Sequence, residues 1–503
     1  MRCRPRLSRL WSCLVLAAAL LAPPAAAAEG VELLRAELEA IFSDPRLREG
    51  QWGVEIVSLD RGETVYGKNA HKLQVPASNV KILTAAAALL RLGPDYRFRT
   101  DLSTDGPVRN GRLEGNLIVA GSGDPSSSSR IPPGDPFHPF RLWAAKLREL
   151  GIRAIGGDIV SGGAPLPAPA HGSGWAWDDL KMGYAAGVSA LQFNENMVAI
   201  RVSPGPAVGS PPSVAVDPYF GYPAVFTEMV TAPRAARPRM EIADGDAGDA
   251  ITVRGTIPLG GAPLERTASV KRPVRYYLSA LRYALGREAI DVSLCAVREG
   301  GVPSRTLWTH HSPPLSELLP PILKQSLNLP SETLLRALGM EIGGEASAAR
   351  GVEIVEDTLE AAGIPKKDFA YVDGSGLSRM NLASPRTLVR VLGCMHAHPR
   401  FPIFYDALAV AGVDGTLETR LRGTPAANNV RAKTGTLSGV SALSGYVRSA
   451  DGEMFAFSMI AGNFLAPVKT AEEVQDRALL RVASFRRGPG PGAGAQPEKR
   501  RDR

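Results

Sequence analysis

A serine and a lysine three residues apart, Ser78 and Lys81, are the first pair in this 503-residue sequence that could carry out covalent chemistry. A serine hydroxyl is a weak nucleophile until a nearby base accepts its proton. A lysine among apolar residues can be that base because burial lowers its pKa, and the run ILTAAAALLRLG follows Lys81. The same pattern also fits a plain helix start before a core helix, so partners elsewhere must decide its meaning.

Two further segments supply such partners. KQSLNLPSE carries a hydroxyl and an amide two residues apart, Ser326 and Asn328, and NNVRAKTGTLSGV places Lys433 directly before Thr-Gly-Thr. Taken alone, the first segment is ordinary loop and cap chemistry, and the second is a solvated lysine at a strand edge. The ordered set Ser-x-x-Lys, Ser-x-Asn, Lys-Thr-Gly is instead the signature of penicillin-reactive serine transferases, with Leu327 where aspartate is usual.

The elements that must position these residues can be read from the flanking sequence. Pro76 and the short polar residues after it predict a helix start, and the apolar run predicts a helix to about Gly93. Ser78 and Lys81 then share one helix face. Ser78 lies in the first turn, where free N–H groups and the helix dipole favour a developing anion. A second helix is expected to begin near 331–332.

The segment around Lys433 alternates as a β-strand, so Lys433 and Gly435 should point to one face and Thr434 and Thr436 to the other. We expect the strand edge to pair with a peptide substrate and Gly435 to let the ligand backbone approach. The N–H groups of Thr436 and Ser78 could together form an oxyanion hole.

Other motifs are weaker. GETVYGKN (62–69) resembles a phosphate-binding loop but ends in asparagine, and the preceding WGVEIVSLDRG reads as a hairpin strand with its turn. The pairs at 310–311 and 396–398 are histidines without a metal-binding cluster, and no G-x-S-x-G motif occurs. We therefore expect no metal and no organic cofactor.

The two ends of the chain differ from the body. Residues 1–28 combine four arginines, an apolar run and an Ala-x-Ala site, which predicts a secretory signal cut after Ala28 and a periplasmic protein without a transmembrane anchor. The Gly/Pro-rich basic tail 486–503 is expected to be disordered. The net charge of +8 is concentrated at these ends, so the nearly neutral body argues against a nucleic-acid partner and leaves at most peripheral contact with membrane or wall.

The chain from about residue 30 to 485 resembles the low-molecular-mass, class C, type-4 penicillin-binding proteins, the D-alanyl-D-alanine carboxypeptidase/endopeptidases. The resemblance rests on ordered blocks: VPASNVKILTAAAAL, GNLIVAGSGDP, GWAWDDLKMGYAAGVSALQFNEN, HHSPPLSELLPPILKQSLNLPSETLL, YVDGSGLSRMN and VRAKTGTLSGVSALSGYV. It implies an α+β fold, in which a penicillin-binding/β-lactamase-like transpeptidase domain, an antiparallel sheet flanked by helices, carries large, mostly β inserted domains.

Mapped on this chain, the resemblance implies a nested order of domains. The catalytic domain would occupy 29–97 and 302–485, inserted domain II 98–205 and 271–301, and inserted domain III 206–270. The segments YRFRTDLSTDG and GRLEGNLIVAG have strand-like patterns, which fits a β-rich insertion.

The resemblance also implies roles for single residues. Ser78 would be the acylated nucleophile and Lys81 its base, and Ser326 and Asn328 would shuttle the proton and bind the peptide. Lys433 is expected to hold the terminal carboxylate together with Thr434, within the substrate-binding run Thr434, Gly435 and Thr436.

For the diaminopimelate side chain of the substrate, the family's recognition groups would be Arg379 for the carboxylate and Asp179 for the ammonium, with Asp178 as the alternative. The implied activity is hydrolysis or de-cross-linking of peptidoglycan stem peptides through an acyl-serine, with β-lactams as inhibitors. Two rivals stay open: a β-lactamase, and a non-catalytic peptidoglycan-binding scaffold.

Overall fold

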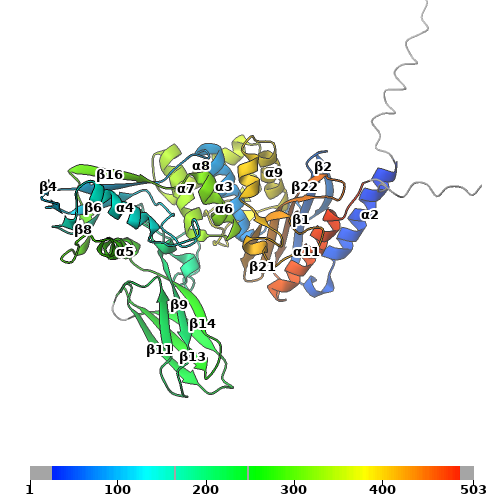
Figure 1. Ribbon diagram of the computed structural model, residues 1–503. Helices are drawn as coiled ribbons and strands as arrows, with labels where there is room; N and C mark the ends of the chain where they lie inside the picture. The colour runs from blue at the N-terminus through cyan, green and yellow to red at the C-terminus, as the bar shows by residue number, and fades with distance from the viewer. Residues whose placement is uncertain (1–24, 164–165, 246–247, 488–503) are drawn as a thin grey trace, which may run out of the picture.

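The structure, a computed structural model, describes residues 25–163, 166–245 and 248–487. Three bodies follow one another in Figure 1: a helix-and-sheet body that holds both ends of the described chain, an adjoining sheet with two helices, and a β lobe that projects from the second body. The predicted signal and tail lie largely outside the described residues, which include only 25–28 of the first and 486–487 of the second.

The main sheet has six strands in the order β19-β20-β21-β22-β1-β2, and every pairing in it is antiparallel. Its strands are β1 (Gln51–Ser58), β2 (Glu63–Lys68), β19 (Ala409–Val410), β20 (Arg431–Leu437), β21 (Val440–Arg448) and β22 (Met454–Gly462). The β1–β2 hairpin confirms the one predicted from WGVEIVSLDRG. Nearly every residue of β21 and β22 is buried because helices cover both faces of the sheet.

Alternate side chains of the sheet enter two different cores. Leu443 and Val447 pack in the core with α2 (Ala25–Phe42) and α11 (Val468–Ala483). Ala442 and Tyr446 enter the larger core on the other face. That core is formed by six helices: α3 (Val80–Arg91), α6 (Leu315–Lys324), α7 (Asn328–Gly343), α8 (Ala348–Ala361), α9 (Pro385–His396) and α10 (Phe401–Asp406).

Two sequence-based helix starts can now be compared with the structure. A 3-10 turn at Ala77–Asn79 leads into α3, as the segment from Pro76 predicts. The start expected near residues 331–332 is wrong, since α7 already begins at Asn328. Pro330 lies in the first turn of that helix, where a backbone N–H has no acceptor within the helix. The missing N–H of proline therefore costs no hydrogen bond, and the helix can begin before it.

The insertion between α3 and α6 forms a mixed five-stranded sheet in the order β15-β8-β6-β3-β16. Its elements are β3 (Arg99–Thr104), β6 (Leu117–Gly121), β8 (Ile159–Gly162), β15 (Val297–Gly301), β16 (Arg305–His311), α4 (His138–Glu149) and α5 (Pro273–Arg287), beside the short strands β4 (Val108–Arg109), β5 (Arg112–Leu113) and β7 (Ala154–Ile155). Because β16 pairs with β3, we propose that the chain re-enters the catalytic domain after His311, later than the expected limit at 302.

The projecting β lobe consists of two three-stranded sheets, β10-β9-β14 and β11-β13-β12 (Figure 1). Its strands are β9 (Met197–Ser203), β10 (Ser213–Asp217), β11 (Val225–Ala232), β12 (Arg239–Asp244), β13 (Ile251–Pro258) and β14 (Leu264–Ser269). Since β9 pairs with β10 and with β14, we propose that domain III begins near 197 rather than 206 and ends near 270.

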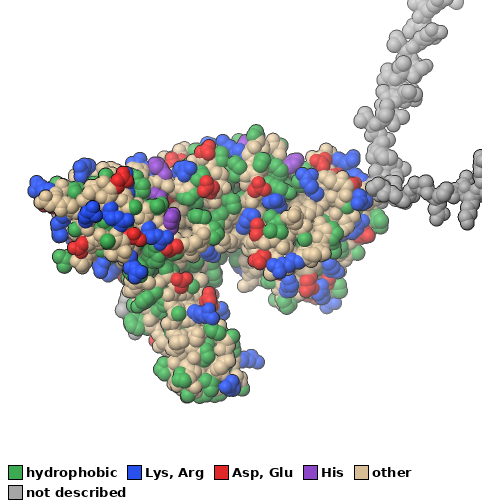
Figure 2. Space-filling model, in the orientation of Figure 1, with side chains coloured by type: hydrophobic (Ala, Val, Ile, Leu, Met, Phe, Trp, Pro, Cys, Tyr) green, Lys and Arg blue, Asp and Glu red, His purple; other side chains and the backbone are tan. Residues whose placement is uncertain are grey.

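The described surface mixes both signs of charge. In Figure 2, Lys and Arg side chains alternate with Asp and Glu over the visible face of all three bodies. Within the described ranges, no helix is both long and apolar enough to span a bilayer.

Candidate active site

Ser78 lies in the 3-10 turn that precedes α3, and Lys81 lies in the first turn of that helix. The Lys81 ammonium is fully buried and donates three hydrogen bonds: to Ser78 Oγ at 2.9 Å, to Asn328 Oδ1 at 2.7 Å and to the Ser375 carbonyl at 2.6 Å. A neutral amine keeps two N–H donors, enough for Asn328 and Ser375. Its lone pair can then accept the Ser78 proton.

Ser326 and Asn328 lie where α6 gives way to α7. Ser326 adopts a left-handed conformation, with φ of 61°, which is uncommon for a residue other than glycine. Asn328 bridges two bodies: its Oδ1 accepts from Lys81, while its Nδ2 donates to the Tyr184 carbonyl of the insertion at 2.9 Å.

Lys433 comes from β20 and is fully buried. Its Nζ donates to Ser326 Oγ and to the Thr434 carbonyl, both at 2.8 Å. The structure thus contains two Ser–Lys hydrogen bonds, one in Ser78–Lys81 and one in Ser326–Lys433. The second joins residues far apart in the chain.

A cavity of about 770 Å³ opens over these groups. Lys81 and Lys433 lie beneath it and do not line it, and neither does Gly435. The lining residues include seven of the sequence candidates, namely Ser78, Asp179, Ser326, Asn328, Arg379, Thr434 and Thr436, and also Asp178, Tyr184 and Thr416.

Gly435 has a role in packing beside the predicted one of admitting the ligand backbone. A Cβ at this position would lie 2.8 Å from the Pro76 carbonyl and 3.0 Å from the Ser78 nitrogen. The glycine therefore lets the serine turn lie directly against β20. The strand expectation itself is confirmed, since Lys433 and Gly435 are buried while Thr434 and Thr436 are at least partly exposed.

The outer edge of β20 is free where it borders the cavity. β19 pairs only with Arg431 and Ala432, so in the described parts of the chain no strand covers 433–437 on that side. An extended peptide could pair with these backbone groups. Beside this edge, Thr434 Oγ1 donates to Thr416 Oγ1 at 2.8 Å. Sequence reasoning missed Thr416, because no local pattern marks the VDGTL turn as a neighbour of β20.

Burial sets the electrostatics of the two lysines. It lowers the pKa of Lys81 to about 7, against the smaller raising effect of Asp373 and Glu332. Burial likewise lowers the pKa of Lys433 well below its usual value, and the nearby Lys81 lowers it further. Two ammonium groups in one dry site are thus disfavoured, which makes a neutral lysine base available near neutral pH.

The loop 371–381 packs against the serine turn, and Arg379 is the only residue of this loop that the sequence marks as a candidate. Asp373 is fully buried and accepts four hydrogen bonds, from the backbone N–H groups of Gly376 and Ser378 and from the side chains of Asn381 and Trp175. This carboxylate therefore shapes the loop that presses on Ser78 and also ties the insertion to the catalytic body through Trp175.

Glu332 is a second buried carboxyl near Lys81. Its Oε1 accepts the Ser375 N–H at 2.8 Å, and its Oε2 has no partner among the described residues. Burial, and then Asp373, raises the pKa of Glu332 to about 7. Ser375 thus connects Glu332 to Lys81, because its carbonyl accepts from the Lys81 Nζ.

The two residues expected to recognise a side chain face the same cavity. Asp179 Oδ1 accepts the Tyr184 hydroxyl at 2.5 Å, while the exposed Arg379 donates to the Ser438 carbonyl at 2.5 Å. Asp178 lines the cavity too, so the alternative between the two aspartates stays open. In the described residues, no group of three His, Cys, Asp or Glu side chains could hold a metal ion.

A serine hydrogen-bonded to a buried lysine, with a second Ser–Lys pair and a free strand edge beside it, defines a serine acyl-transfer enzyme on an α+β fold. The family model described as D-Ala-D-Ala carboxypeptidase 3 (S13) matches residues 34–482. The chain therefore belongs to this family, and it is a serine-type D-Ala-D-Ala carboxypeptidase.

Individual relatives agree with this assignment. The D-alanyl-D-alanine carboxypeptidase of Actinomadura sp. (strain R39) is 33% identical over 506 residues, covering 94% of this chain and 91% of that protein. The crystal structure of penicillin binding protein 4 (dacB) from Haemophilus influenzae matches with a TM-score of 0.77 at 27% identity, over 88% of this chain and 97% of that one. A structure of the same protein with a novel β-lactam matches with a TM-score of 0.70 at 26% identity, over 88% and 98%.

Proposed function

We propose that Ser78 is the nucleophile and Lys81 its general base in the hydrolysis of D-alanyl-D-alanine stem peptides. The observation that carries this assignment is the 2.9 Å hydrogen bond between Ser78 Oγ and a fully buried Lys81 Nζ. Ser78 Oγ adds to the carbonyl carbon of the penultimate D-alanine as its proton passes to Lys81. The N–H groups of Ser78 and Thr436 stabilise the resulting oxyanion.

The leaving amine needs a proton when the C–N bond breaks. Ser326 Oγ lines the cavity and is backed by Lys433, so this pair can pass to the leaving amine the proton that Lys81 took from Ser78, with Asn328 orienting the peptide. This transfer returns Lys81 to its neutral form. Water then attacks the Ser78 ester, Lys81 accepts the water proton and gives it to Ser78 Oγ as the ester C–O bond breaks. The net reaction consumes one water and releases D-alanine, or the amine of a cross-linked peptide.

Lys433 stabilises the carboxylate of the substrate through its charge, without direct contact. Its side chain is fully buried and does not reach the cavity, so we assign the direct contacts to the hydroxyls of Thr434 and Thr416. An incoming carboxylate favours the charged form of Lys433. The free edge of β20 pairs with the peptide backbone.

The cavity also has groups for a longer substrate. Arg379 is suited to the carboxylate and Asp179 to the ammonium at the free end of a diaminopimelate side chain. Exopeptidase and endopeptidase reactions use the same serine, so we propose that both D-alanine release and cleavage of cross-links occur here.

β-Lactams are the expected inhibitors, since they present a reactive amide beside a carboxylate, and the Haemophilus influenzae relative has been crystallised with one. We place the enzyme in the periplasm on the strength of the predicted signal 1–28. Its partners there are peptidoglycan stem peptides.

Intact-mass spectrometry after exposure to penicillin, with peptide mapping, tests the nucleophile. We expect a stable adduct of the whole β-lactam on the peptide that contains Ser78, and none in Ser78→Ala. Rapid destruction of penicillin without an adduct would indicate a β-lactamase. No adduct with intact penicillin would indicate a binding scaffold. Release of D-alanine from a pentapeptide, measured in parallel, tests the hydrolase activity itself.

A further inference from the structure

A second cavity lies on the other side of the chain segment that carries Asp179. This cavity, about 470 Å³ in volume, is formed between that segment and the β lobe. Its lining comes from the 170–187 segment and from β12, β13 and the end of β14, and comprises Ala170, His171, Trp177, Leu180, Lys181, Gly187, Ile242, Ala243, Asp244, Ile251, Ser269, Val270, Lys271 and Pro273. We call it the lobe cavity.

The segment 174–181 is shared between the two cavities. Its residues Ala176, Asp178 and Asp179 line the catalytic cavity, whereas Trp177 and Lys181 line the lobe cavity. The two cavities therefore lie on either side of one short segment of the chain.

Both ends of the shared segment are fixed. At one end Trp175 Nε1 donates to the Asp373 carboxylate at 2.8 Å. At the other, Ser269 in β14 donates from its N–H to the Lys181 carbonyl at 3.0 Å and from its hydroxyl to the Leu180 carbonyl at 2.6 Å. The same hydrogen bonds, those of Trp175 and Ser269, thus fix the positions of both cavities relative to Ser78.

Two side chains of the lobe cavity are available to a ligand. The Trp177 side chain is 83% exposed, although tryptophan is usually well buried. Lys181 is exposed, and among the described residues its ammonium has no salt-bridge partner within 4 Å, although its charge helps to lower the pKa of the exposed Glu241. The other cation, Lys271, pairs with Asp244 at 3.1 Å. An open indole face beside an ammonium without a close salt-bridge partner suits a ligand that joins an apolar ring face to a carboxylate.

We propose that the lobe cavity binds the glycan end of a peptidoglycan strand, with a pyranose ring stacked on Trp177 and a carboxylate of the muramyl peptide at Lys181. This inference rests on the proposed function, because the stem peptide held at Ser78 is joined to the amino sugar at its other end. The β lobe then serves as a wall of the substrate site, and the enzyme distinguishes stem peptides attached to glycan from free ones.

The test compares two substrates that share one scissile bond, a disaccharide pentapeptide and the same N-acetylated pentapeptide without sugar. For the unaltered protein we expect a KM about fivefold lower for the sugar-bearing substrate. Trp177→Ala should remove that difference and leave the rate of penicillin acylation unchanged. The matched control is Tyr219→Ala, which removes another aromatic side chain, 70% exposed, that does not line the cavity.

A binding measurement separates this inference from the catalytic proposal. Titration calorimetry with N-acetylmuramyl-L-alanyl-D-glutamate, which lacks the scissile bond, should give a Kd about fivefold weaker in Trp177→Ala and in Lys181→Ala, with Lys367→Ala as the charge control. This result is expected even if the unaltered protein hydrolyses neither substrate. Equal KM values for the two substrates, or a fragment that binds Trp177→Ala as well as the unaltered protein, would overturn the lobe-cavity proposal.

Discussion

Among single residues, the chemistry that we propose for Ser78 depends on the buried amine of Lys81. Lys81 has three acceptors within 2.9 Å. The carbonyl of Ser375 and the amide oxygen of Asn328 can only accept, whereas the Ser78 hydroxyl can also donate its proton. When Lys81 becomes neutral, the Ser78 hydroxyl can donate a hydrogen bond to the amine instead of accepting one from it. The site therefore switches between two hydrogen-bonded states without moving heavy atoms.

The rate of acylation should follow the protonation of Lys81. Burial lowers its pKa to about 7, so the amine is neutral above that pH and charged below it. We expect the second-order rate constant for penicillin acylation to fall about tenfold for each pH unit below 7 and to level off above about pH 8. Stopped-flow acylation between about pH 5.5 and 8.5 measures this profile, and a flat profile would show that Lys81 is not the titrating base.

Glu332→Gln should move this profile toward acid. The amide can still accept the Ser375 N–H, but it removes a carboxyl whose ionised form raises the pKa of Lys81. Because the pKa of Glu332 is itself about 7, this charge is only partly present at neutral pH. The midpoint of the acylation profile should fall by up to about one pH unit. Glu341→Gln, an exposed carboxyl on the same helix, is the control and should leave the midpoint in place.

At the scale of elements, the serine turn is held between a strand and a loop that both approach it through glycine. Gly435 of β20 lies on one side, and Gly376 of the 371–381 loop lies on the other. A Cβ on Gly376 would lie 2.0 Å from the Ala77 carbonyl, and its φ of 80° also disfavours a side chain. The position of Ser78 thus depends on backbone contacts that only glycine permits.

Gly376→Ala should therefore damage both stability and acylation. The added methyl must displace the serine turn, so we expect a loss of more than about 2 kcal/mol in the free energy of unfolding and a fall of at least about 100-fold in acylation rate. Urea denaturation and penicillin labelling measure the two effects. Gly344→Ala is the matched control: φ is 76°, but no atom lies within 4 Å, so only about 1 kcal/mol of backbone strain and no change in acylation is expected.

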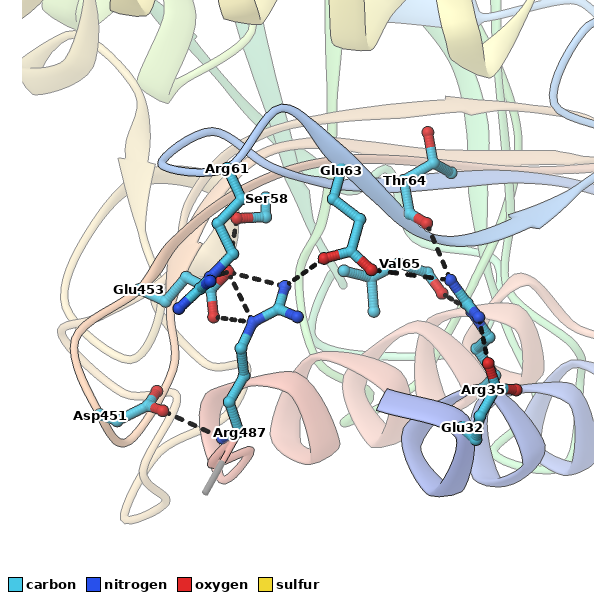
Figure 3. A network of polar contacts seen from close by, with 10 residues as sticks. All are labelled: Glu32, Arg35, Ser58, Arg61, Glu63, Thr64, Val65, Asp451, Glu453 and Arg487. Atoms are coloured by element: carbon cyan, nitrogen blue, oxygen red, sulfur yellow. Dashed lines mark hydrogen bonds and ion pairs between the residues drawn. The ribbon is translucent and has the colours of Figure 1, made fainter. Parts of the chain in front are cut away.

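In the molecule as a whole, segments from the two ends of the described chain pack against each other in the catalytic body. β1 pairs with β22, and α2 packs beside α11 on one face of the sheet. A polar network adds to this closure, as Figure 3 shows: Arg487 binds Glu453 at 2.7 Å and Glu63 at 2.8 Å, and its side chain is only 10% exposed. The end of the described chain thus stabilises the hairpin formed near its beginning.

Arg487→Ala should lower the stability of the whole fold. It removes the closest cation from the buried carboxylate of Glu453, which leaves Arg61 at 3.4 Å and the Ser58 hydroxyl as its partners. We expect a loss of about 3 kcal/mol in unfolding free energy, measured from the urea midpoint. Arg48→Ala breaks an exposed pair with Glu49 and should cost less than about 0.5 kcal/mol, whereas equal losses in the two variants would contradict the role of burial.

The sequence by itself determined the features that depend on near neighbours in the chain. The spacing of Ser78 and Lys81, together with the apolar run after them, was enough to predict the helix, the burial of the lysine and the lowering of its pKa. The alternation in β20 likewise predicted that Lys433 and Gly435 point to one face and Thr434 and Thr436 to the other. Such periodic patterns are set by backbone geometry and need no knowledge of distant residues.

Only the tertiary structure decided which distant groups meet. It paired Lys433 with Ser326, brought Thr416 to Thr434, and placed Glu332 behind Ser375. The motifs mark Ser326, Lys433 and Thr434 as candidates, but no local pattern marks these pairings. It also assigned Gly435 to the packing of the serine turn. The three hydrogen bonds join residues 18 to 107 positions apart in the chain, and their geometry follows from how helices and sheet pack, which a linear pattern does not specify.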